Sequence, residues 1–308
     1  MKEHLPKPLT GIIPPMVTPL QNQDNLDHEG LEHLVEHILT GGVSGLFILG
    51  TTGEAPALSY RLRYELIERV CRQVQNRVPV LVGISDTSYV ESLKLAEFAK
   101  NQDAAAVVLA PPYYFPAGQP ELLEYLEHLA PKIPLPIFLY NMPGNTKIMI
   151  EPQTVYQAAR IPNVVGLKDS SANMIYFHKV RLCLKDRPDF TLLTGPEELL
   201  AESVLLGGHG GVCGGANIIP ALYVNLYQAS AKREFETLTE LHQQVMKIST
   251  TVYSTGKYGS SIIKGIKCAL NLMGICNDFI SEPFHRFREP EREKIKKALV
   301  ELNLIENA

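Results

Sequence analysis

The chain has 308 residues, of which 45% are hydrophobic and 20% charged, so it can form one large domain or two ordinary ones. A net charge of −4 and a pI near 6.2 argue against a general binder of nucleic acid or of anionic membranes. The first ten residues carry no apolar run fit for a signal peptide, and no later run is long enough to cross a bilayer. We therefore expect a cytoplasmic protein that binds neither nucleic acid nor a membrane.

Five cysteines, at positions 71, 183, 213, 268 and 276, are odd in number, and no two of them have C-x-x-C spacing. This favours reduced thiols over a disulfide framework or a zinc site. The sequence also lacks H-x-H, H-E-x-x-H and clustered carboxylates, which are common patterns of metal ligands. We therefore expect no metal and no cofactor.

Short apolar runs alternate along the chain with longer amphipathic segments. The apolar runs predict eight strands, at residues 12–17, 43–49, 78–83, 104–109, 136–141, 164–167, 190–194 and 211–213. The segments between them predict helices at residues 27–40, 59–75, 88–100, 120–130, 151–159, 171–184 and 196–206. Strict alternation implies right-handed βαβ units and a parallel sheet. Eight such strands within roughly 230 residues predict an α/β fold, a closed (β/α)8 TIM barrel rather than an open sheet.

The strand pattern stops near residue 231. Three further helices are predicted beyond it, at residues 234–250, 262–273 and 289–302. We therefore expect a catalytic barrel over residues 1–230 and a helical C-terminal extension over residues 231–308.

The sixth predicted strand stops at Lys168, the first charge after a buried apolar run. This position is the carboxyl end of the strand, the edge at which barrels carry out their chemistry. An amine held against apolar walls loses hydration, and its neutral form, which attacks ketones and forms imines, becomes more accessible. Most lysines at strand ends lie in water, so the assignment depends on what else collects at this edge.

Other strand ends bring hydroxyl groups, glycines and aromatic rings to the same edge. Tyr140 ends the fifth strand, and a phenol there can pass protons to and from a carbinolamine on the lysine. Thr51, Thr52 and Gly53 form a turn after the second strand, and its backbone N–H groups suit a carboxylate. The edge also receives Tyr113, Tyr114, Gly195 and the glycine-rich run around Val212. A lysine, a tyrosine and a threonine pair that converge in space indicate covalent imine chemistry on a 2-oxo acid.

Four motifs carry a resemblance to a known family. They are G-T-T-G-E at residues 50–54, Y-N-x-P at 140–143, V-G-L-K-D-S at 165–170 and L-G-G-H-G-G-V at 206–212. Together and in this order, they resemble the dihydrodipicolinate synthase / N-acetylneuraminate lyase family of class I pyruvate-dependent aldolases over nearly the whole chain. The resemblance implies a lyase that forms a Schiff base with pyruvate and that assembles as a homotetramer, a dimer of dimers.

The resemblance also implies roles for individual residues. Lys168 would form the Schiff base, and Tyr140 would shuttle protons. Thr51 and Thr52 would hold the pyruvate carboxylate and join the proton relay.

Four further positions complete the predicted site. By resemblance, Tyr114 would be the relay tyrosine that reaches a neighbouring subunit's site, and Val212 would offer its backbone carbonyl near the pyruvate. Gly53 and Gly195 lie in turns at strand ends and are expected to bind substrate.

One position departs from the family pattern. Dihydrodipicolinate synthases carry an arginine five residues past the tyrosine that grips the carboxylate of the second substrate, whereas this chain has Asn145 there. An asparagine cannot make the charged bidentate contact of a guanidinium. Losing such a contact in a desolvated site costs about 2–5 kcal/mol. Asn145 therefore favours a hydroxylated substrate chain, as in 2-keto-3-deoxy sugar acids or similar 4-hydroxy-2-oxo acids.

The sequence thus predicts a class I aldolase that makes or breaks a carbon–carbon bond between pyruvate and an aldehyde. Dihydrodipicolinate synthase, also called 4-hydroxy-tetrahydrodipicolinate synthase, is the first alternative. N-acetylneuraminate lyase and an imine-using dehydratase are others, although sialic acid lyases typically lack the asparagine that follows the tyrosine here, Asn141. A non-catalytic 2-oxo acid sensor is an alternative of another class, but a sensor has no need of a nucleophile.

Overall fold

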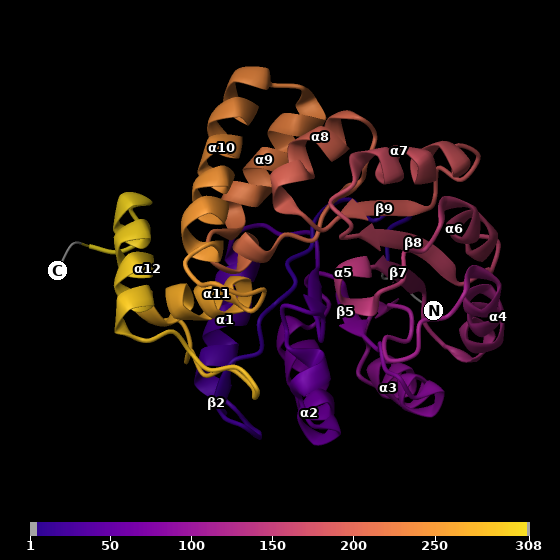
Figure 1. Ribbon diagram of the computed structural model, residues 1–308, viewed down its shortest axis with the longest axis horizontal. Helices are drawn as coiled ribbons and strands as arrows, with labels where there is room; N and C mark the ends of the chain where they lie inside the picture. Colours follow the sequence, from indigo (N-terminus) through magenta and orange to yellow (C-terminus); the bar gives the residue numbers. More distant parts are fainter. Residues whose placement is uncertain (1–4, 307–308) are drawn as a thin grey trace.

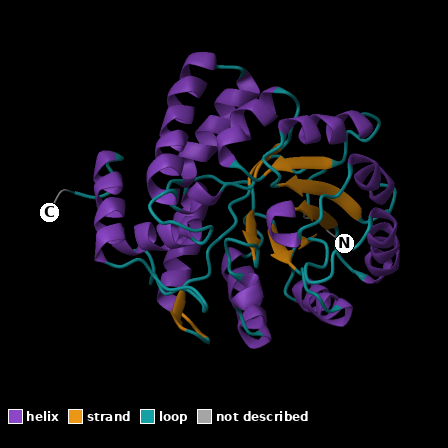
Figure 2. Ribbon diagram, in the orientation of Figure 1, coloured by secondary structure: helices purple, strands orange, loops and turns teal. Residues whose placement is uncertain are grey.

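The computed structural model of the chain describes residues 5–306. Residues 1–4 of the amino-terminal stretch, for which no signal peptide is predicted, lie outside the described residues. Eight parallel strands form one curled sheet in the order β1-β10-β9-β8-β7-β6-β5-β4, with helices around it (Figures 1 and 2). They are β1 (Gly11–Ile12), β4 (Leu46–Ile48), β5 (Val80–Gly83), β6 (Ala106–Leu109), β7 (Ile137–Asn141), β8 (Val164–Asp169), β9 (Thr191–Thr194) and β10 (Gly210–Gly211). The predicted (β/α)8 barrel is confirmed.

Helices follow the strands along the chain and cover the outside of the barrel (Figure 2). They are α1 (His28–Thr40), α2 (Tyr60–Val74), α3 (Tyr89–Asn101), α4 (Gln119–Leu129), α6 (Pro152–Ala158), α7 (Met174–Cys183), α8 (Leu200–Leu205) and α9 (Pro220–Lys232). Short 3-10 turns lie at Ala55–Ala57, Ala130–Lys132, Glu197–Leu199 and Gly214–Asn217.

The C-terminal extension lies on one side of the barrel (Figure 1). It consists of α10 (Phe235–Ile248), a π-helical turn (Ser249–Tyr253), α11 (Ser261–Leu272) and α12 (Glu289–Glu301), so the three predicted helices are present. The division into two domains at residue 230 stays a prediction. Within residues 5–306, no helix combines the length and the apolar character needed to span a membrane.

Prolines shorten the first strand, which the sequence predicts for residues 12–17. β1 ends at Ile12, because Pro14 and Pro15 have no N–H to donate to a ladder. The chain nevertheless continues beside β4, where the Phe47 N–H donates to the Pro14 carbonyl at 3.0 Å and the Phe47 carbonyl accepts from the Met16 N–H at 2.8 Å. These bonds close the barrel between its first strand and β4.

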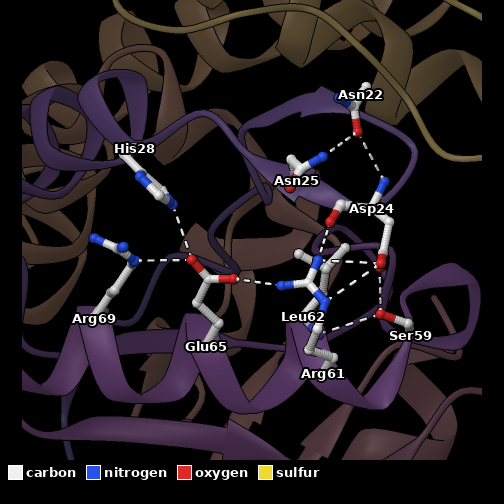
Figure 3. A network of polar contacts seen from close by, with 9 residues as sticks. All are labelled: Asn22, Asp24, Asn25, His28, Ser59, Arg61, Leu62, Glu65 and Arg69. Carbon is white, nitrogen blue, oxygen red and sulfur yellow. Dashed lines mark hydrogen bonds and ion pairs between the residues drawn. The ribbon is translucent and has the colours of Figure 1, made fainter.

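A two-stranded antiparallel hairpin, β2 (Leu20–Asn22) and β3 (Asn25–Leu26), was not predicted. Its strands are too short for an alternating pattern to be recognised in the sequence. A polar network fixes the hairpin to α2 (Figure 3), in which Asp24 accepts the Ser59 hydroxyl and pairs with Arg61 at 3.1 Å. Arg61 also pairs with Glu65 at 3.0 Å. The hairpin is therefore held by side chains at and near the start of α2.

The hydrophobic core has two parts. The inner part fills the barrel with inward-facing strand residues, among them Ile13, Phe47, Leu81, Val108, Phe138, Val165, Leu193 and Val212. The outer part lies between the strands and the helices, and it continues into the extension through Val245, Ile248, Ile266 and Ile295. The extension therefore shares a continuous core with the barrel helices.

A buried ion pair also joins the extension to the barrel. Glu54, in the turn after β4, pairs with Lys267 of α11, and the two side chains are 4% and 1% exposed. Glu54 Oε2 accepts the Ser281 N–H at 2.8 Å, and Lys267 Nζ donates to the Phe279 carbonyl at 2.7 Å. Burial lowers the pKa of Lys267, and the Glu54 carboxylate offsets this only in part.

We expect Lys267→Met to lower the free energy of unfolding by about 3–5 kcal/mol, because it leaves the Glu54 carboxylate buried without its counter-charge. Urea unfolding followed by circular dichroism measures this loss. Arg77→Met is the control, since it breaks an exposed pair with Glu36 and should cost at most about 1 kcal/mol. Equal losses in the two variants would contradict the importance of the buried pair.

Candidate active site

The site is built on the neighbouring strands β7 and β8. The predicted end of β8 at residue 167 is wrong by two residues, because Lys168 and Asp169 still pair with β7 and β9. Tyr140 lies opposite Lys168, and Asn141 lies opposite Asp169. Since side chains alternate along a strand, Tyr140 and Lys168 share one face. Tyr140 belongs to the inner core, so that face is the interior of the barrel.

Asn141 and Asp169 join the two strand ends on the other face. Asn141 Nδ2 donates to Asp169 Oδ1 at 2.8 Å, and Asp169 also accepts the N–H and the hydroxyl of Ser171, each at 3.0 Å. Burial raises the pKa of Asp169, while the hydrogen bonds from Asn141 and Ser171 act in the opposite direction. These contacts hold the strand ends in register and thereby align the two inward-facing side chains.

The Lys168 amine lies against two aromatic rings. Its Nζ is 4.1 Å from the centroid of the Tyr140 ring and 5.0 Å from that of Phe47, and the residue is 5% exposed. Aromatic faces attract a cation through their quadrupole, so the rings fix the position of the amine when it is protonated. The predicted nucleophile therefore lies inside the barrel and away from bulk water.

The Tyr140 hydroxyl lies 3.2 Å from the Thr51 hydroxyl, and either group can donate the hydrogen bond. Burial raises the pKa of Tyr140, but the charge of Lys168 and polar contacts with Thr51, Ser170 and Lys168 outweigh it, so that the pKa lies below its ordinary value. A phenol with a lowered pKa transfers its proton more readily near neutral pH. The phenol and the threonine hydroxyl thus form a hydrogen-bonded pair, and the Lys168 amine lies against the ring of the phenol.

A cavity of about 450 Å³ adjoins these side chains. Of the predicted site residues, Thr51, Tyr140 and Asn145 line it. Lys168 is not itself a lining residue, but its amine contacts Phe47 and Tyr140, which are. Within residues 5–306, no group of three or more His, Cys, Asp or Glu side chains is placed to hold a metal ion.

Four predicted substrate-binding residues, Thr52, Gly53, Gly195 and Val212, lie outside the cavity lining. The Gly53 carbonyl accepts the hydroxyl of Thr18 at 2.7 Å. The Gly195 N–H donates to the Asp169 carbonyl at 2.7 Å, and the Val212 N–H donates to the Thr194 carbonyl at 2.8 Å. In this structure these backbone groups brace the turns and strand ends, and their roles in substrate binding stay predictions.

The two adjacent tyrosines lie in different places. Tyr113 lines the cavity, and burial, assisted by the charge of Asp86, raises its pKa. Tyr114 is 75% exposed, and its ring packs edge to face against a second exposed ring, that of Phe115, at 5.0 Å between centroids. Within one subunit Tyr114 is therefore outside this cavity, and its predicted role at a neighbouring subunit's site stays a prediction.

The sequence analysis missed one short helix and several residues of the cavity lining. The helix is α5 (Pro143–Thr146), which follows β7 and carries the predicted Asn145. Lys147, a lining residue that was not predicted, ends the helix with a left-handed backbone (φ 61°). Pro143 at the first helical position is a start signal that could have revealed this helix. Ile263 of α11 and Phe284, between α11 and α12, also line the cavity, and no local pattern predicts that contact.

We expect the Tyr140 phenol to titrate below the ordinary tyrosine range, and its pKa to rise in Lys168→Met because that variant lacks the charge that favours the phenolate. The absorbance of tyrosinate as a function of pH measures the pKa of Tyr140 in wild type and in Lys168→Met. Subtracting the absorbance of the same protein with Tyr140→Phe isolates the signal of this phenol. An identical titration in wild type and Lys168→Met would show that the lysine does not control the phenol.

Comparison with known proteins places the chain in a family. A sequence model described as the Dihydrodipicolinate synthetase family matches residues 8–302. A 4-hydroxy-tetrahydrodipicolinate synthase of Pseudomonas syringae pv. syringae (strain B728a) is 31% identical over 291 residues, which are 94% of this chain and 97% of that protein. An enzyme of the same name from Methanocaldococcus jannaschii is 31% identical over 96% of this chain and 99% of its own.

Two solved structures extend the likeness to three dimensions. Dihydrodipicolinate synthase from Bacteroides thetaiotaomicron is 57% identical, with a TM-score of 0.93 over 96% of this chain and 99% of that one. YagE, a prophage protein of E. coli K12 solved in complex with pyruvate, is 30% identical, with a TM-score of 0.91 and the same coverage. The family match spans the barrel and nearly all of the extension, so the resemblance predicted from the four motifs is confirmed, and the chain belongs to the dihydrodipicolinate synthetase family of pyruvate-dependent lyases.

Proposed function

We propose that this lyase is a class I aldolase that forms an imine between Lys168 and pyruvate. The observation that carries the proposal is the convergence of the buried Lys168 amine, the Tyr140 phenol and the Thr51 hydroxyl beside one cavity. The structure of YagE with pyruvate supports the choice of ligand.

In the proposed reaction, the neutral Lys168 amine attacks C2 of pyruvate, and Tyr140 transfers protons to the carbinolamine oxygen until water leaves. The protonated imine then accepts the electron pair of a C3–H bond when that carbon loses its proton. The resulting enamine attacks the aldehyde carbon, whose oxygen takes up a proton, and water finally releases the product and the free amine. Cleavage runs through the same steps in reverse, so the direction depends on the concentrations of the reactants.

We propose a 2-keto-3-deoxy sugar acid, or a similar 4-hydroxy-2-oxo acid, as the substrate. Asn145 lines the cavity and offers neutral donors and acceptors to hydroxyl groups. An amide satisfies a hydroxyl without the desolvation cost of burying a charge, which fits a polyhydroxylated chain.

4-Hydroxy-tetrahydrodipicolinate synthase is the second candidate. Curated relatives bear this name, and one structural feature favours it. Lys147 lines the cavity two residues after Asn145, and its Nζ donates to the Gly144 carbonyl at 2.7 Å. This exposed ammonium can supply a positive charge for the carboxylate of aspartate semialdehyde, although without the fork geometry of an arginine.

A homotetramer built as a dimer of dimers is part of the proposal. The exposed Tyr114 and Phe115 rings, and the exposed Ile175 and Leu182 on α7, are apolar surfaces of the kind that subunit contacts cover. One relative is described as a monomeric variant, so the molecular mass in solution must be measured for this chain.

Borohydride reduction in the presence of pyruvate should give a covalent adduct on Lys168, heavier by pyruvic acid less one oxygen, which peptide mass spectrometry locates. Lys168→Ala should show neither adduct nor turnover. Tyr140→Phe should still form the adduct while turnover falls by roughly 10²–10⁴, the usual effect of losing a general acid–base group. An adduct on another lysine, or full activity in Lys168→Ala, would contradict the proposed chemistry.

Wild-type enzyme should use glyceraldehyde with pyruvate at a higher kcat/KM than aspartate semialdehyde with pyruvate. Asn145→Arg should raise kcat/KM for aspartate semialdehyde by about tenfold or more, since it adds a charge-assisted contact to the carboxylate. Asn145→Gln is the neutral control and should leave that value low. A wild-type preference for aspartate semialdehyde would instead favour the second candidate.

A further inference from the structure

Two residues of the active-site cavity come from outside the barrel. Ile263 belongs to α11, and Phe284 lies in the segment between α11 and α12. Both are in the C-terminal extension, whereas the other lining residues follow barrel strands or lie on them. The extension is therefore part of the cavity as well as a support for the barrel.

The segment that carries Phe284 is held by two polar contacts, one to the turn after β4 and one to the β2–β3 hairpin. The Ser281 N–H donates to Glu54 Oε2 at 2.8 Å, three residues along the chain from Thr51. Beside the β2–β3 hairpin (Figure 1), the Glu282 N–H donates to Gln23 Oε1 at 3.1 Å. Hydrogen bonds at two consecutive residues shortly before Phe284 hold that ring in a defined place at the cavity.

Phe284 is 42% exposed, so much of its ring is not used to fill the core. On one side, Lys264 Nζ lies 6.0 Å from the ring centroid, within the range of a cation–π contact. An aromatic ring that lines a cavity and keeps open surface can gain apolar contact from a bound molecule. The carbon chain of a sugar acid offers such contact through its C–H groups, while its hydroxyl groups need polar partners such as Asn145.

We infer that Phe284 and Ile263 form the wall that contacts the substrate chain beyond C3, and that the C-terminal extension thereby determines which acceptors the enzyme takes. This inference rests on the proposed imine at Lys168. When a substrate longer than pyruvate is attached to that amine, its atoms beyond C3 occupy the rest of the cavity. Pyruvate itself is too short to need the wall, so the two residues affect long substrates and not the imine step.

The test compares two 2-oxo acids in the borohydride reaction of the full-length enzyme. Pyruvate has three carbons, and 2-oxohexanoate has the six-carbon length of a 2-keto-3-deoxy hexonic acid but no hydroxyl at C4, so it cannot be cleaved. In Phe284→Ala the concentration that half-saturates trapping should rise about three- to tenfold for 2-oxohexanoate, because apolar contact is lost. The value for pyruvate should change less than about twofold.

Phe235→Ala is the matched control, since it removes an exposed phenylalanine of the same extension that does not line the cavity. Ile263→Ala provides an independent variant with the same expected selectivity. Unchanged values for 2-oxohexanoate, or equal changes for both acids, would overturn the inference alone. Failure of the wild-type enzyme to form any pyruvate adduct would overturn the proposed function, and the inference with it.

Discussion

The geometry of this site depends on the register in which β7 pairs with β8. Because side chains alternate along a strand, a slip of one residue would turn Tyr140 and Lys168 to opposite faces of the sheet. The apolar residues before them bury both strands, and the ladder has one irregularity, between Ile137 and Phe138. The hydrogen bond between Asn141 and Asp169 adds a directional constraint at the last pair of the ladder. The residue after each proposed catalytic side chain thus positions that side chain, and the Y-N and K-D dipeptides of the motifs combine chemistry with alignment.

The turn after β4 likewise contributes both to the cavity and to the attachment of the C-terminal extension. Thr51 faces the Tyr140 hydroxyl, and Glu54, three residues later, lines the cavity, pairs with Lys267 and accepts the Ser281 N–H. Its backbone has a positive φ of 59°, an uncommon conformation for a residue other than glycine, and the buried ion pair holds it there. The G-T-T-G-E motif is therefore both a wall of the cavity and the attachment point of the extension.

The parts of the fold and site that the sequence predicts are those that depend on neighbours along the chain. Lys168 and Tyr140 are recognisable because each is a polar residue at the end of a buried apolar run. The alternation of strands and helices likewise predicts the barrel. Strand ends are less predictable: Lys168 stays in the ladder although it is charged, with its amine against aromatic rings, one of them from β4. The contribution of Phe284 could not be predicted, because it depends on how a helical extension docks onto a distant turn.

The closure of the barrel has a consequence for the order of assembly. β1 pairs with β10, where Gly11 lies opposite Gly210, and beyond Ile12 the same segment continues beside β4. A nascent chain can place this segment against β4 early, but its other edge stays unpaired until residue 211 has left the ribosome. Contacts between such distant residues form late, because closing a long loop costs entropy before any pairing is gained. Until then β1 and β9 both present open edges, and a chain truncated before β10 would carry those edges permanently, as templates for aggregation.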